Sequence, residues 1–557
     1  MLAKDLEFVA NELLPIKLAL WKILYAKRGF FSIVELWNKS VRRNPDNVFL
    51  KGDGYRYSYG EFDRVVNDIA CRLRELGLGP KDKVAVVGES VPNCVAHLIA
   101  CLKLDIVPLV MRPSSTEAQF TSFLTGHGEI RFLFGTEAGL AKIPPSIQAR
   151  LGRVMRYAKL PGPATKSGSF KTSGVRFSDV AFHVGTSGSS GNSKSVAVHH
   201  GALLAFIIVH KSMKGIRPDD VVYGMASLSH GDGLAIGVVT PWTVGAALFL
   251  DESFSFETFV EKCVKHGVTI FNHIGTTPRK LLRQPASELE RQLKLRVSNG
   301  HEMISSVWDD FKTRFGVSNV VEYYCSSEGL TLFLNRTKVG AAGFMGPISK
   351  KLYPFELVKL DEHGNFALEG GKPVPCKPGE VGEVLGFVDP TDPLSQMNSY
   401  EDKDIENAKM FRSLFEQGDC WFRSGDLLRH DADGYIHFVG RLVQTTKIGG
   451  EYVSFPHVED EVLAHCEIDD CCVAAVKVPD AKELELAVLV RTREPAAFAE
   501  ISKKLERVKQ ARSIRYIVSA EQPFTYTESF RIVRTLPNPM SPQELTRCGT
   551  VYDRKNA

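Results

Sequence analysis

The sequence predicts an α/β protein with a large N-terminal body of several sheets and a small C-terminal α/β domain. Short apolar runs rich in β-branched residues alternate with helical patterns along most of the chain, which is typical of sheets covered by helices. The 557 residues are too many for one hydrophobic core, so two or more domains are expected. A turn-rich break near Gly440-Arg441 separates the longer part from the shorter one.

Residues 1–30 are predicted to form an amphipathic helix. Within and after Phe8–Ala26 the large apolar residues recur at helical steps and alternate with basic ones, namely Leu14, Leu18, Trp21 and Tyr25 with Lys17, Lys22, Lys27 and Arg28. This pattern favours a helix at a membrane surface over one that crosses the membrane. A helix docked on the protein's own core explains the same pattern, so both interpretations stay open.

The body, residues 31–440, begins with strands and helices in alternation. Val84–Val87 and Ile106–Val110 predict strands of a buried sheet, and Cys94–Leu104 predicts the helix between them. Val180–Val184 and Val268–Phe271 have the same apolar character and predict two more buried strands.

Gly233–Leu250 carries no charged residue and is about as long as a membrane span. Pro241 and several glycines interrupt it. We therefore expect a buried helix, a turn and the core strand Ala246–Leu250 rather than a membrane helix.

Residues 441–557 are predicted to form the small domain. They follow a turn sequence, Asp431-Ala-Asp-Gly-Tyr435, and a predicted strand at Tyr435–Val439. A shorter α/β pattern then extends to about Arg534, which is the size of a separate lid domain.

Composition argues against several kinds of partner. The formal net charge of +4 and the pI of about 8.3 are too mild to favour nucleic acid. The 11 cysteines are scattered, and the adjacent pair Cys471-Cys472 lacks metal-ligand spacing. Reduced thiols are therefore expected rather than a zinc site or a disulfide framework.

A loop of glycine and hydroxyl residues after Val184 is the sharpest local signal. Its glycines let backbone N–H groups converge on an oxyanion, and its hydroxyl groups and lysine add donors. The predicted phosphate-binding residues are Thr186, Ser187, Gly188, Ser189, Ser190, Gly191 and Lys194. The loop differs from a Walker loop because Ser193 replaces the glycine before the lysine. A surface loop without a ligand is the alternative.

Three further motifs follow in order: Tyr323-Tyr-Cys-Ser-Ser-Glu328, Arg423-Ser-Gly-Asp426 and Gly434-Tyr-Ile-His-Phe-Val-Gly-Arg441. Together with the loop, they resemble the motifs of adenylate-forming (AMP-binding) enzymes, which include acyl-CoA synthetases, luciferases and nonribosomal adenylation domains. Additional segments resemble the fatty acid transport proteins, or very-long-chain acyl-CoA synthetases: Asn299-Gly300, Trp308, Arg314-Phe315, Val339–Phe344 and Pro375–Glu383. The resemblance extends from about Phe30 to Arg534. It implies an adenylate-forming body with a small, mobile C-terminal domain.

The resemblance implies that a fatty acid carboxylate attacks the α-phosphate of ATP and that coenzyme A then displaces AMP from the acyl-AMP. ATP, Mg²⁺ and coenzyme A are therefore the expected cofactors. Lys194 and a Mg²⁺ ion associated with Glu328 would offset the repulsion between the anions. Ser327 of the same motif is expected to contact the nucleotide. An exposed loop carboxylate is the alternative for Glu328.

The nucleoside would be held by residues of three motifs. Asp426 would accept hydrogen bonds from the ribose hydroxyl groups, and Arg441 would add positive charge beside them. Tyr324 would offer its ring to adenine, next to the backbone of Asn299 and Gly300. Burial in the core is the alternative for Tyr324.

Two residues are expected to act near the acyl group. His230, in Ser229-His-Gly-Asp-Gly233, matches a family position beside the acyl and phosphate groups; a structural histidine is the alternative. Lys447, in Lys447-Ile-Gly-Gly450, resembles a segment that faces the site during thioester formation; a solvated hairpin is the alternative.

Several positions depart from the family pattern. Arg531 stands where the family has a lysine that bridges carboxylate and phosphates, and a planar guanidinium does not reproduce a compact ammonium. Gln444 replaces the usual hinge aspartate, Cys325 replaces a glycine, and Ser193 replaces a proline. These changes place turnover in more doubt than nucleotide binding.

The leading hypothesis is a long- or very-long-chain fatty acid–CoA ligase in peripheral contact with a membrane, facing the cytosol at the endoplasmic reticulum or peroxisome, or else in the cytoplasm. A weakened homologue that binds or transports fatty acids is the alternative, because of Arg531. Adenylation of a non-lipid acid or an amino acid is a third hypothesis, for which the sequence offers no clear acidic partner of a substrate amine.

Overall fold

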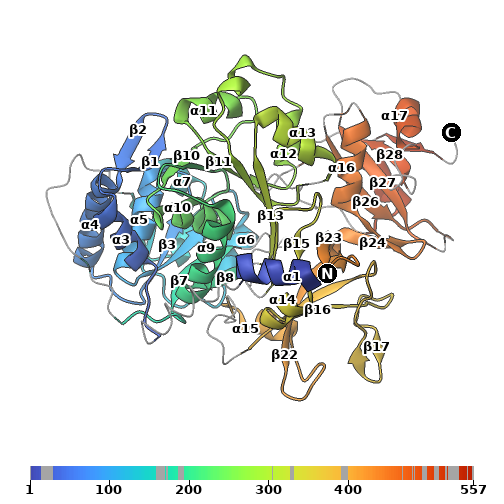
Figure 1. Cartoon of the computed structure of the whole chain (residues 1–557), viewed down its shortest axis with the longest axis horizontal. Coiled ribbons are helices and arrows are strands. Elements are labelled where there is room, and N and C mark those ends of the chain that lie inside the picture. The colour runs from blue at the N-terminus through green and yellow to red at the C-terminus, as the bar shows by residue number, and fades with distance from the viewer. Residues whose placement is uncertain are drawn as a thin grey trace.

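A computed structural model of the 557-residue chain (Figure 1) describes most of its residues. They are 2–13, 29–157, 170, 174–185, 194–303, 305–326, 331–389, 399–466, 468, 470–479, 481, 483–491, 498–506, 514–520, 524, 539–548 and 550–554.

One large sheet of the body has seven strands among the described residues, in the order β20-β8-β7-β4-β3-β5-β6. In that order they are Ser399–Tyr400, Ser195–His199, Val180–Gly185, Val107–Met111, Lys83–Val87, Phe132–Gly135 and Arg153–Arg156. The pairs from β7 to β6 are parallel, and β3, β4 and β5 are almost wholly buried. Their continuous apolar runs reflect burial on both faces.

The other large sheet has eight strands in the described part of the chain, in the order β14-β13-β12-β11-β9-β10-β1-β2. In that order they are Leu332–Asn335, Asn319–Cys325, Val297–His301, Ile270–Ile274, Val221–Gly224, Ala247–Leu250, Val48–Gly52 and Tyr55–Ser58. The six inner strands are parallel, and the two edge strands are antiparallel. The carboxyl ends of the inner strands therefore lie along one edge of the sheet.

Helices cover and connect these two sheets (Figure 1). They are α3 (Val34–Arg43), α4 (Tyr59–Glu75), α5 (Pro92–Lys103), α6 (Glu117–Leu124), α7 (Glu137–Ala141), α8 (Pro145–Arg150), α9 (His200–Lys214), the π-helix η2 (Asp232–Val239), α10 (Thr240–Trp242), α11 (Phe259–His266), α12 (Thr277–Leu282), η3 (Glu288–Gln292) and α13 (Ser305–Phe315). One hydrophobic cluster takes residues from both sheets and from α3, α4, α5, α9 and η2. This shared core joins the two sheets into one body.

A third sheet, in which all described strand pairs are antiparallel, completes the body. It has the order β15-β23-β22-β19-β16 with β21 beside β22; the strands are Gly343–Phe344, Tyr435–Arg441, Cys420–His430, Val381–Phe387, Phe355–Val358 and Met410–Arg412. The helices α14 (Pro347–Leu352) and α15 (Lys403–Lys409) and the hairpin β17 (Leu368–Glu369) with β18 (Lys372–Pro373) accompany it.

Residues after Arg441 form η4 (Leu442–Gln444), the hairpin β24 (Thr445–Ile448) with β25 (Glu451–Ser454), and a sheet of their own. That sheet has the order β26-β27-β28-β29, with strands Asp470–Val476, Glu485–Arg491, Ile514–Ser519 and Val551–Asp553. The helices α16 (Phe455–His465), α17 (Phe498–Leu505) and α18 (Pro542–Thr546) accompany it, and it lies at the right in Figure 1. The predicted α/β class is confirmed; the boundaries at residues 30 and 440 stay predictions.

The predicted strands and helix of the body are present, with shifted ends. The largest shift concerns Val268–Phe271, because the observed strand is β11, Ile270–Ile274. The Thr269 hydroxyl donates to Asp220 Oδ1 at 2.7 Å and accepts from Val221 N–H at 2.9 Å. Thr269, which makes these side-chain hydrogen bonds, is the residue immediately before the first residue of β11.

Gly233–Leu250 forms the predicted helix, turn and buried strand, as η2, α10, a turn at Gly245 with φ of 85°, and β10. Among the described residues, no helix is long and apolar enough to cross a membrane.

The N-terminal segment contains α1 (Leu2–Phe8) and the π-helix η1 (Val9–Leu13). Asp5 is fully buried and accepts from the backbone N–H groups of Ile348 at 2.5 Å and Ser349 at 3.2 Å, in the first turn of α14. Residues 2–13 are therefore docked on the body, as one of the two interpretations requires. Residues 14–28, which carry most of the amphipathic pattern, lie outside the described residues.

Candidate functional site

Three of the predicted nucleotide-binding residues come together where β13, β22 and β23 meet. The Tyr324 hydroxyl donates to Asp426 Oδ2 at 2.7 Å, and Arg441 Nε lies 3.5 Å from Asp426 Oδ1. Asp426 and Arg441 are register partners of β22 and β23, which explains how two separate motifs meet. A carboxylate can accept several hydrogen bonds, which suits the predicted role of Asp426 toward the ribose hydroxyl groups.

The Tyr324 ring is buried as well as bonded. It stacks on Phe333 of the neighbouring strand, with ring centroids 5.5 Å apart and an interplanar angle of 25°. Burial, together with the adjacent Asp426, raises the pKa of Tyr324 well above its usual value. The phenol therefore remains a proton donor at neutral pH, and it orients the Asp426 carboxylate.

Asn299 and Gly300 lie in β12, between β11 and β13. A Cβ on Gly300 would come within 2.0 Å of the carbonyl oxygen of His273. The glycine is therefore required by the close approach of β11. His273 itself is hydrogen bonded to Ser298 Oγ and to Glu322 Oε1, both at 2.8 Å. Burial lowers the pKa of His273 to about 3.

Lys194, the last residue of the predicted phosphate loop, lies directly before β8. Its Nζ is 5.8 Å from the centroid of the Tyr400 ring in β20, the strand that pairs with β8. The backbone N–H of Glu401 also donates to Ser195 O at 3.2 Å. Ser195, the residue after the loop, is thus held between β7 and the segment after β20.

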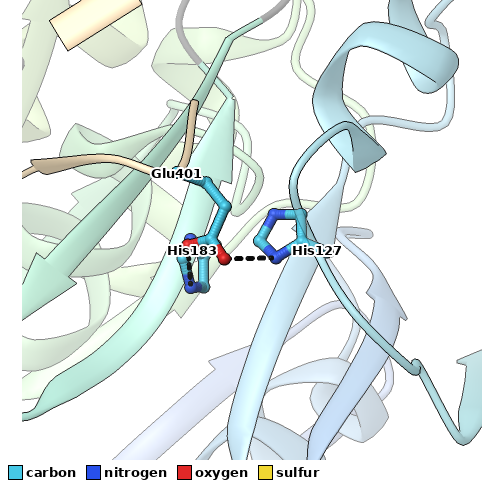
Figure 2. Close-up of side chains that lie close together, drawn as sticks. All are labelled: His127, His183 and Glu401. Carbon is cyan, nitrogen blue, oxygen red and sulfur yellow. Dashed lines mark ion pairs between the residues drawn. The ribbon is translucent and has the colours of Figure 1, made fainter. Parts of the chain in front are cut away.

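A network around Ser195 strengthens this connection. Figure 2 shows His127, His183 and Glu401 pointing toward one another from the segment after α6, from β7 and from the segment after β20. Lys83 Nζ donates to Glu401 Oε1 at 2.8 Å and approaches His127 Nδ1 at 3.3 Å. Ser195 Oγ lies 3.0 Å from His127 Nε2 and 3.2 Å from His183 Nδ1.

The distances allow one consistent chain of donors and acceptors, which runs from Lys83 through His127 and Ser195 to His183. An ammonium only donates, so His127 Nδ1 accepts from Lys83, and His127 Nε2–H donates to Ser195, whose hydroxyl donates to His183 Nδ1. Both rings are then neutral, and burial indeed lowers the pKa of His127 to about 4 and that of His183 well below its usual value. Two imidazoles and a carboxylate also resemble a zinc ligand set. Lys83 already supplies the positive charge here, so we interpret the cluster as a hydrogen-bonded support of the loop.

His230 lies at the entry to η2 and pairs with a residue that the sequence did not single out. Its Nδ1 is 3.4 Å from Asp232 Oδ2, and His301 Nε2 lies 3.2 Å from the same oxygen. Burial opposes ionisation of Asp232, but the charge of His230 and the hydrogen bond of His301 outweigh it and lower the pKa of Asp232. Its place two residues after His230 is the signal that could have identified it.

Gln444 and Lys447 lie in consecutive elements after Arg441, because β24, which contains Lys447, follows η4 directly. Gln444 ends η4. Lys447 Nζ is directed at the carbonyl oxygens of Leu360 and Asp361, at 3.4 and 3.3 Å, and lies 4.7 Å from the Tyr452 ring centroid. Lys447 therefore contacts the loop after β16 in this arrangement, and its role in thioester formation stays a prediction.

The remaining predicted site residues lie outside the described residues. They are Thr186, Ser187, Gly188, Ser189, Ser190 and Gly191 of the loop, Ser327 and Glu328 of the second motif, and Arg531. Glu328 is the expected holder of Mg²⁺, so the association of that ion with the second motif stays a prediction.

The description "AMP-binding enzyme" matches residues 37–385, which is more than half of the chain. The chain belongs to the AMP-binding enzyme family. Asp426 and Arg441 lie beyond the matched range, yet Asp426 accepts from Tyr324 inside that range, and Arg441 pairs with Asp426. The nucleotide-binding prediction for them therefore rests on the motif order and on this contact.

Individual relatives agree with the family. The chain is 29% identical over 459 residues to the medium/long-chain-fatty-acid–CoA ligase FadD6 of Mycobacterium tuberculosis (strain ATCC 25618 / H37Rv), covering 80% of this chain and 75% of the relative. It is 28% identical over 476 residues to long-chain fatty acid transport protein 1 of Mus musculus, covering 81% and 73%.

A solved structure extends the likeness to the fold. The anthranilate CoA ligase AuaEII, in complex with anthranoyl-AMP, has a TM-score of 0.73 at 18% identity, covering 91% of this chain and 96% of that one. This similarity confirms the predicted adenylate-forming fold.

Proposed function

We propose that this AMP-binding enzyme is an ATP-dependent ligase that converts long or very long chain fatty acids to acyl-CoA through an acyl-AMP intermediate. The observation that carries the proposal is the contact of Tyr324, Asp426 and Arg441, which come from three motifs. Asp426 and Arg441 offer a carboxylate and a guanidinium in one place, and the buried Tyr324 hydroxyl orients the carboxylate. That combination suits a nucleoside phosphate.

The chain's own residues would bind and orient the reactants. Asp426, oriented by the Tyr324 hydroxyl, would accept from the ribose hydroxyl groups. Arg441 and Lys194 would bring positive charge to the phosphates and reduce their repulsion of the incoming fatty acid carboxylate. ATP and Mg²⁺ serve adenylation, and coenzyme A would take the acyl group in the second step.

The names of the relatives support the substrate class. One is a medium/long-chain-fatty-acid–CoA ligase, and the other is a long-chain fatty acid transport protein. The anthranoyl-AMP bound to the structural neighbour supports an acyl-AMP intermediate. Long-chain specificity in this chain is our proposal.

Fatty-acid-dependent exchange of pyrophosphate into ATP tests the proposal with purified protein and Mg²⁺. We expect exchange with at least one long-chain acid and formation of the corresponding acyl-CoA when coenzyme A is added. Exchange no faster than the acid-free background, across all chain lengths, would remove the ligase proposal.

A second proposal is that the chain is a weakened homologue that binds or transports fatty acids. Arg531 in place of lysine and Gln444 in the hinge favour it. This proposal expects ATP and fatty acid binding by calorimetry without measurable exchange. Rapid exchange by the unaltered protein would exclude it.

The ligase would work in peripheral contact with a membrane that faces the cytosol, at the endoplasmic reticulum or peroxisome. The basic and apolar residues of the segment 14–28 support this. Replacement of Lys17 and Lys22 by glutamate should reduce sedimentation with anionic vesicles; unchanged sedimentation would count against the contact.

A further inference from the structure

The turn that leads into η2 fixes the backbone of His230. The His230 N–H donates to the carbonyl oxygen of Ser227 at 3.0 Å, and the His230 carbonyl oxygen accepts from Leu234 N–H at 3.2 Å. A Cβ on Gly233 would come within 2.0 Å of the Ser227 carbonyl oxygen, so the turn closes this tightly only with glycine there. The His230 side chain therefore starts from a defined position, and 27% of it is exposed to solvent.

Asp232 contacts the His230 ring through its backbone and its side chain. Its backbone N–H donates to His230 Nδ1 at 3.2 Å, and its Oδ2 lies 3.4 Å from the same nitrogen. In a neutral ring, a nitrogen that accepts carries no proton, so the proton is on Nε2. In a protonated ring, both nitrogens carry a proton, and the carboxylate becomes the acceptor for Nδ1–H. Nε2 is therefore a donor in both states of the ring.

The Asp232 carboxylate is held by side chains of β12 and β13. An ionised carboxylate only accepts, so His301 Nε2–H donates to Asp232 Oδ2, at 3.2 Å. Burial, followed by the charge of Asp232 and a hydrogen bond with it, raises the pKa of Tyr323 well above its usual value, so the phenol stays a donor. His301 ends β12 directly after Gly300, and its side chain and that of Asp232 are each 18% exposed. The cluster thus reaches solvent at the carboxyl end of a predicted nucleotide strand.

A basic side chain from α9 also interacts with Asp232. Lys214, at the end of that helix, donates to Asn272 Oδ1 at 2.9 Å. Burial lowers the pKa of Lys214 to about 7, and the charge of Asp232 opposes that effect. Together with His230 and His301, Lys214 surrounds the carboxylate with groups that stabilise its ionised form.

Adenylation needs hydrogen-bond donors rather than a base at the place predicted for His230. A fatty acid carboxylate is ionised at neutral pH, so one of its oxygens attacks the α-phosphorus while pyrophosphate leaves, and no proton has to be removed. Both reactants are anions, and donors aimed at their oxygens stabilise the transition state. A ring whose Nε2 always carries a proton supplies such a donor.

We propose that Asp232 is a positioning residue for adenylation: it holds the His230 ring with a proton on Nε2, from which the ring donates to an anionic oxygen of the reactants. His301 and Tyr323 hold Asp232 in this arrangement. The inference rests on the proposed ligase function and on the predicted place of His230 beside the acyl and phosphate groups. It makes His230 a donor and excludes it as a general base through Nε2.

Two replacements of His230 test its role as a donor. In His230→Gln, the side-chain amide reaches about the position of Nε2 and donates, but it cannot act as a base. With the acid that the wild type uses best, kcat for pyrophosphate release should stay within about tenfold of the wild type. In His230→Ala it should fall by about 100-fold or more, as for a lost oxyanion donor. Equal rates in the two variants would contradict the donor role.

A double-mutant cycle tests whether Asp232 acts through His230. Asp232→Ala removes the carboxylate and keeps the backbone N–H. It should lower kcat by about tenfold and leave the KM for ATP unchanged, because the lost contact acts in the transition state. In the His230→Ala background, the same substitution should cause no further fall. Falls that multiply, or a rise in the KM for ATP with unchanged kcat, would show that Asp232 does not position His230.

A second variant and a matched control complete the cycle. His301→Leu removes a partner that holds the carboxylate, so it should also lower kcat only while His230 is present; an equal fall in the His230→Ala background would contradict the arrangement. The control is Asp53→Asn, which alters an Asp–His pair between the β1–β2 turn and α11, in which Asp53 Oδ1 lies 3.1 Å from His266 Nε2. Its kcat should equal that of its parent in both backgrounds.

Nitrogen-15 NMR of protein labelled at histidine separates this inference from the ligase proposal. At about pH 8.5, where an ordinary imidazole is neutral, the signals that His230→Gln removes should show a proton on Nε2 and none on Nδ1. A proton on Nδ1 would overturn the inference, whether or not the enzyme turns over. A proton on Nε2 with no turnover of any acid would overturn the ligase function and retain the arrangement of Asp232 and His230.

Discussion

Asp426 is the residue on which the nucleotide site depends most directly, since it contacts both Tyr324 and Arg441. Asp426→Asn keeps an acceptor for Tyr324 but loses the charge and one acceptor oxygen. A hydrogen bond to a charged group is worth about 1.5–3 kcal/mol, so the KM for ATP should rise about 10- to 100-fold. Steady-state kinetics with ATP and fatty acid varied separately measure it.

Tyr324→Phe is the control for this prediction. It keeps the ring that stacks on Phe333 and loses only the hydroxyl that orients Asp426, so its effect on the KM for ATP should be smaller. An unchanged KM for ATP in Asp426→Asn, or a rise confined to the KM for the fatty acid, would show that Asp426 does not bind the ribose.

Arg531 offers a test by restoration. If this residue aligns with the family's lysine, Arg531→Lys should raise the rate of pyrophosphate exchange by about tenfold or more. A compact ammonium can make a transition-state contact that the wider, planar guanidinium of arginine cannot make in the same position. Arg531→Gln, which removes the charge, should lower the rate below that of the wild type. A lower rate in Arg531→Lys would mean that the site is adapted to arginine.

Buried histidines predict how stability depends on pH. Burial lowers the pKa of His97 from 6.5 to about 4, so the folded protein keeps this ring neutral while the unfolded chain takes up a proton below about pH 6.5. The stability that this difference contributes is complete above that pH and is lost as pH falls toward 4. At pH 5 the loss lowers the free energy of unfolding by about 2 kcal/mol.

His97→Phe tests this contribution, because phenylalanine can keep the packing against Phe134 and Tyr157. Between pH 7 and 5, the melting temperature of this variant should fall less than that of the wild type, as measured by scanning calorimetry. His363→Gln is the control, since His363 has a side chain that is 75% exposed. An equal fall in all three proteins would contradict the prediction.

At the scale of elements, the sequence predicted the buried strands well, because strands covered on both faces are continuously apolar. Val180–Val184 became β7 (Val180–Gly185), and Ala246–Leu250 became β10 (Ala247–Leu250). The hairpin signal at Asp431–Tyr435 became the turn between β22 and β23, in which Asp431 N–H donates to Tyr435 O. In each case the signal was local in the sequence.

Pairings between distant residues could not be predicted in this way. Glu401 reaches His127 and His183 only because β20 pairs with β8 across the edge of a sheet. Lys214 ends an apolar helix, and Asn272 lies inside an apolar strand. Nothing local distinguishes either from an ordinary polar residue; their meeting depends on how α9 packs on the sheet.

Asp5 is a further contact of this kind, and it yields a prediction about one element. Its carboxylate caps the first turn of α14, so Asp5→Ala should destabilise the docked N-terminal helix by about 1 kcal/mol, which is typical of a lost cap. Hydrogen exchange of the amides of Ile348 and Ser349 should rise. Glu7→Ala, an exposed residue of the same helix, is the control and should leave that exchange unchanged.

At the scale of the whole molecule, α12 of the body meets α16, which follows the hinge. Arg279 Nη1 pairs with Asp460, and Arg283 donates to the carbonyl oxygen of Leu463. Burial raises the pKa of Asp460, and the charge of Arg279 opposes that effect. This contact therefore holds the segment after Arg441, which carries Lys447, in one position relative to α12. In the proposed two-step reaction, any rotation of that segment must first break the contact.

Arg279→Gln should release this contact, because removing one partner of a buried ion pair leaves the other charge uncompensated, at a cost of about 3 kcal/mol. We expect faster hydrogen exchange in α16 and faster proteolysis near Leu442–Gln444. The charge-swapped protein, Arg279→Asp with Asp460→Arg, should recover part of the protection. Arg291→Gln removes an exposed pair with Glu288 and should change neither rate. If Arg279→Gln protects α16 as well as the wild type does, the position of the small domain is set by its strands β24 and β25 against β23 rather than by α12.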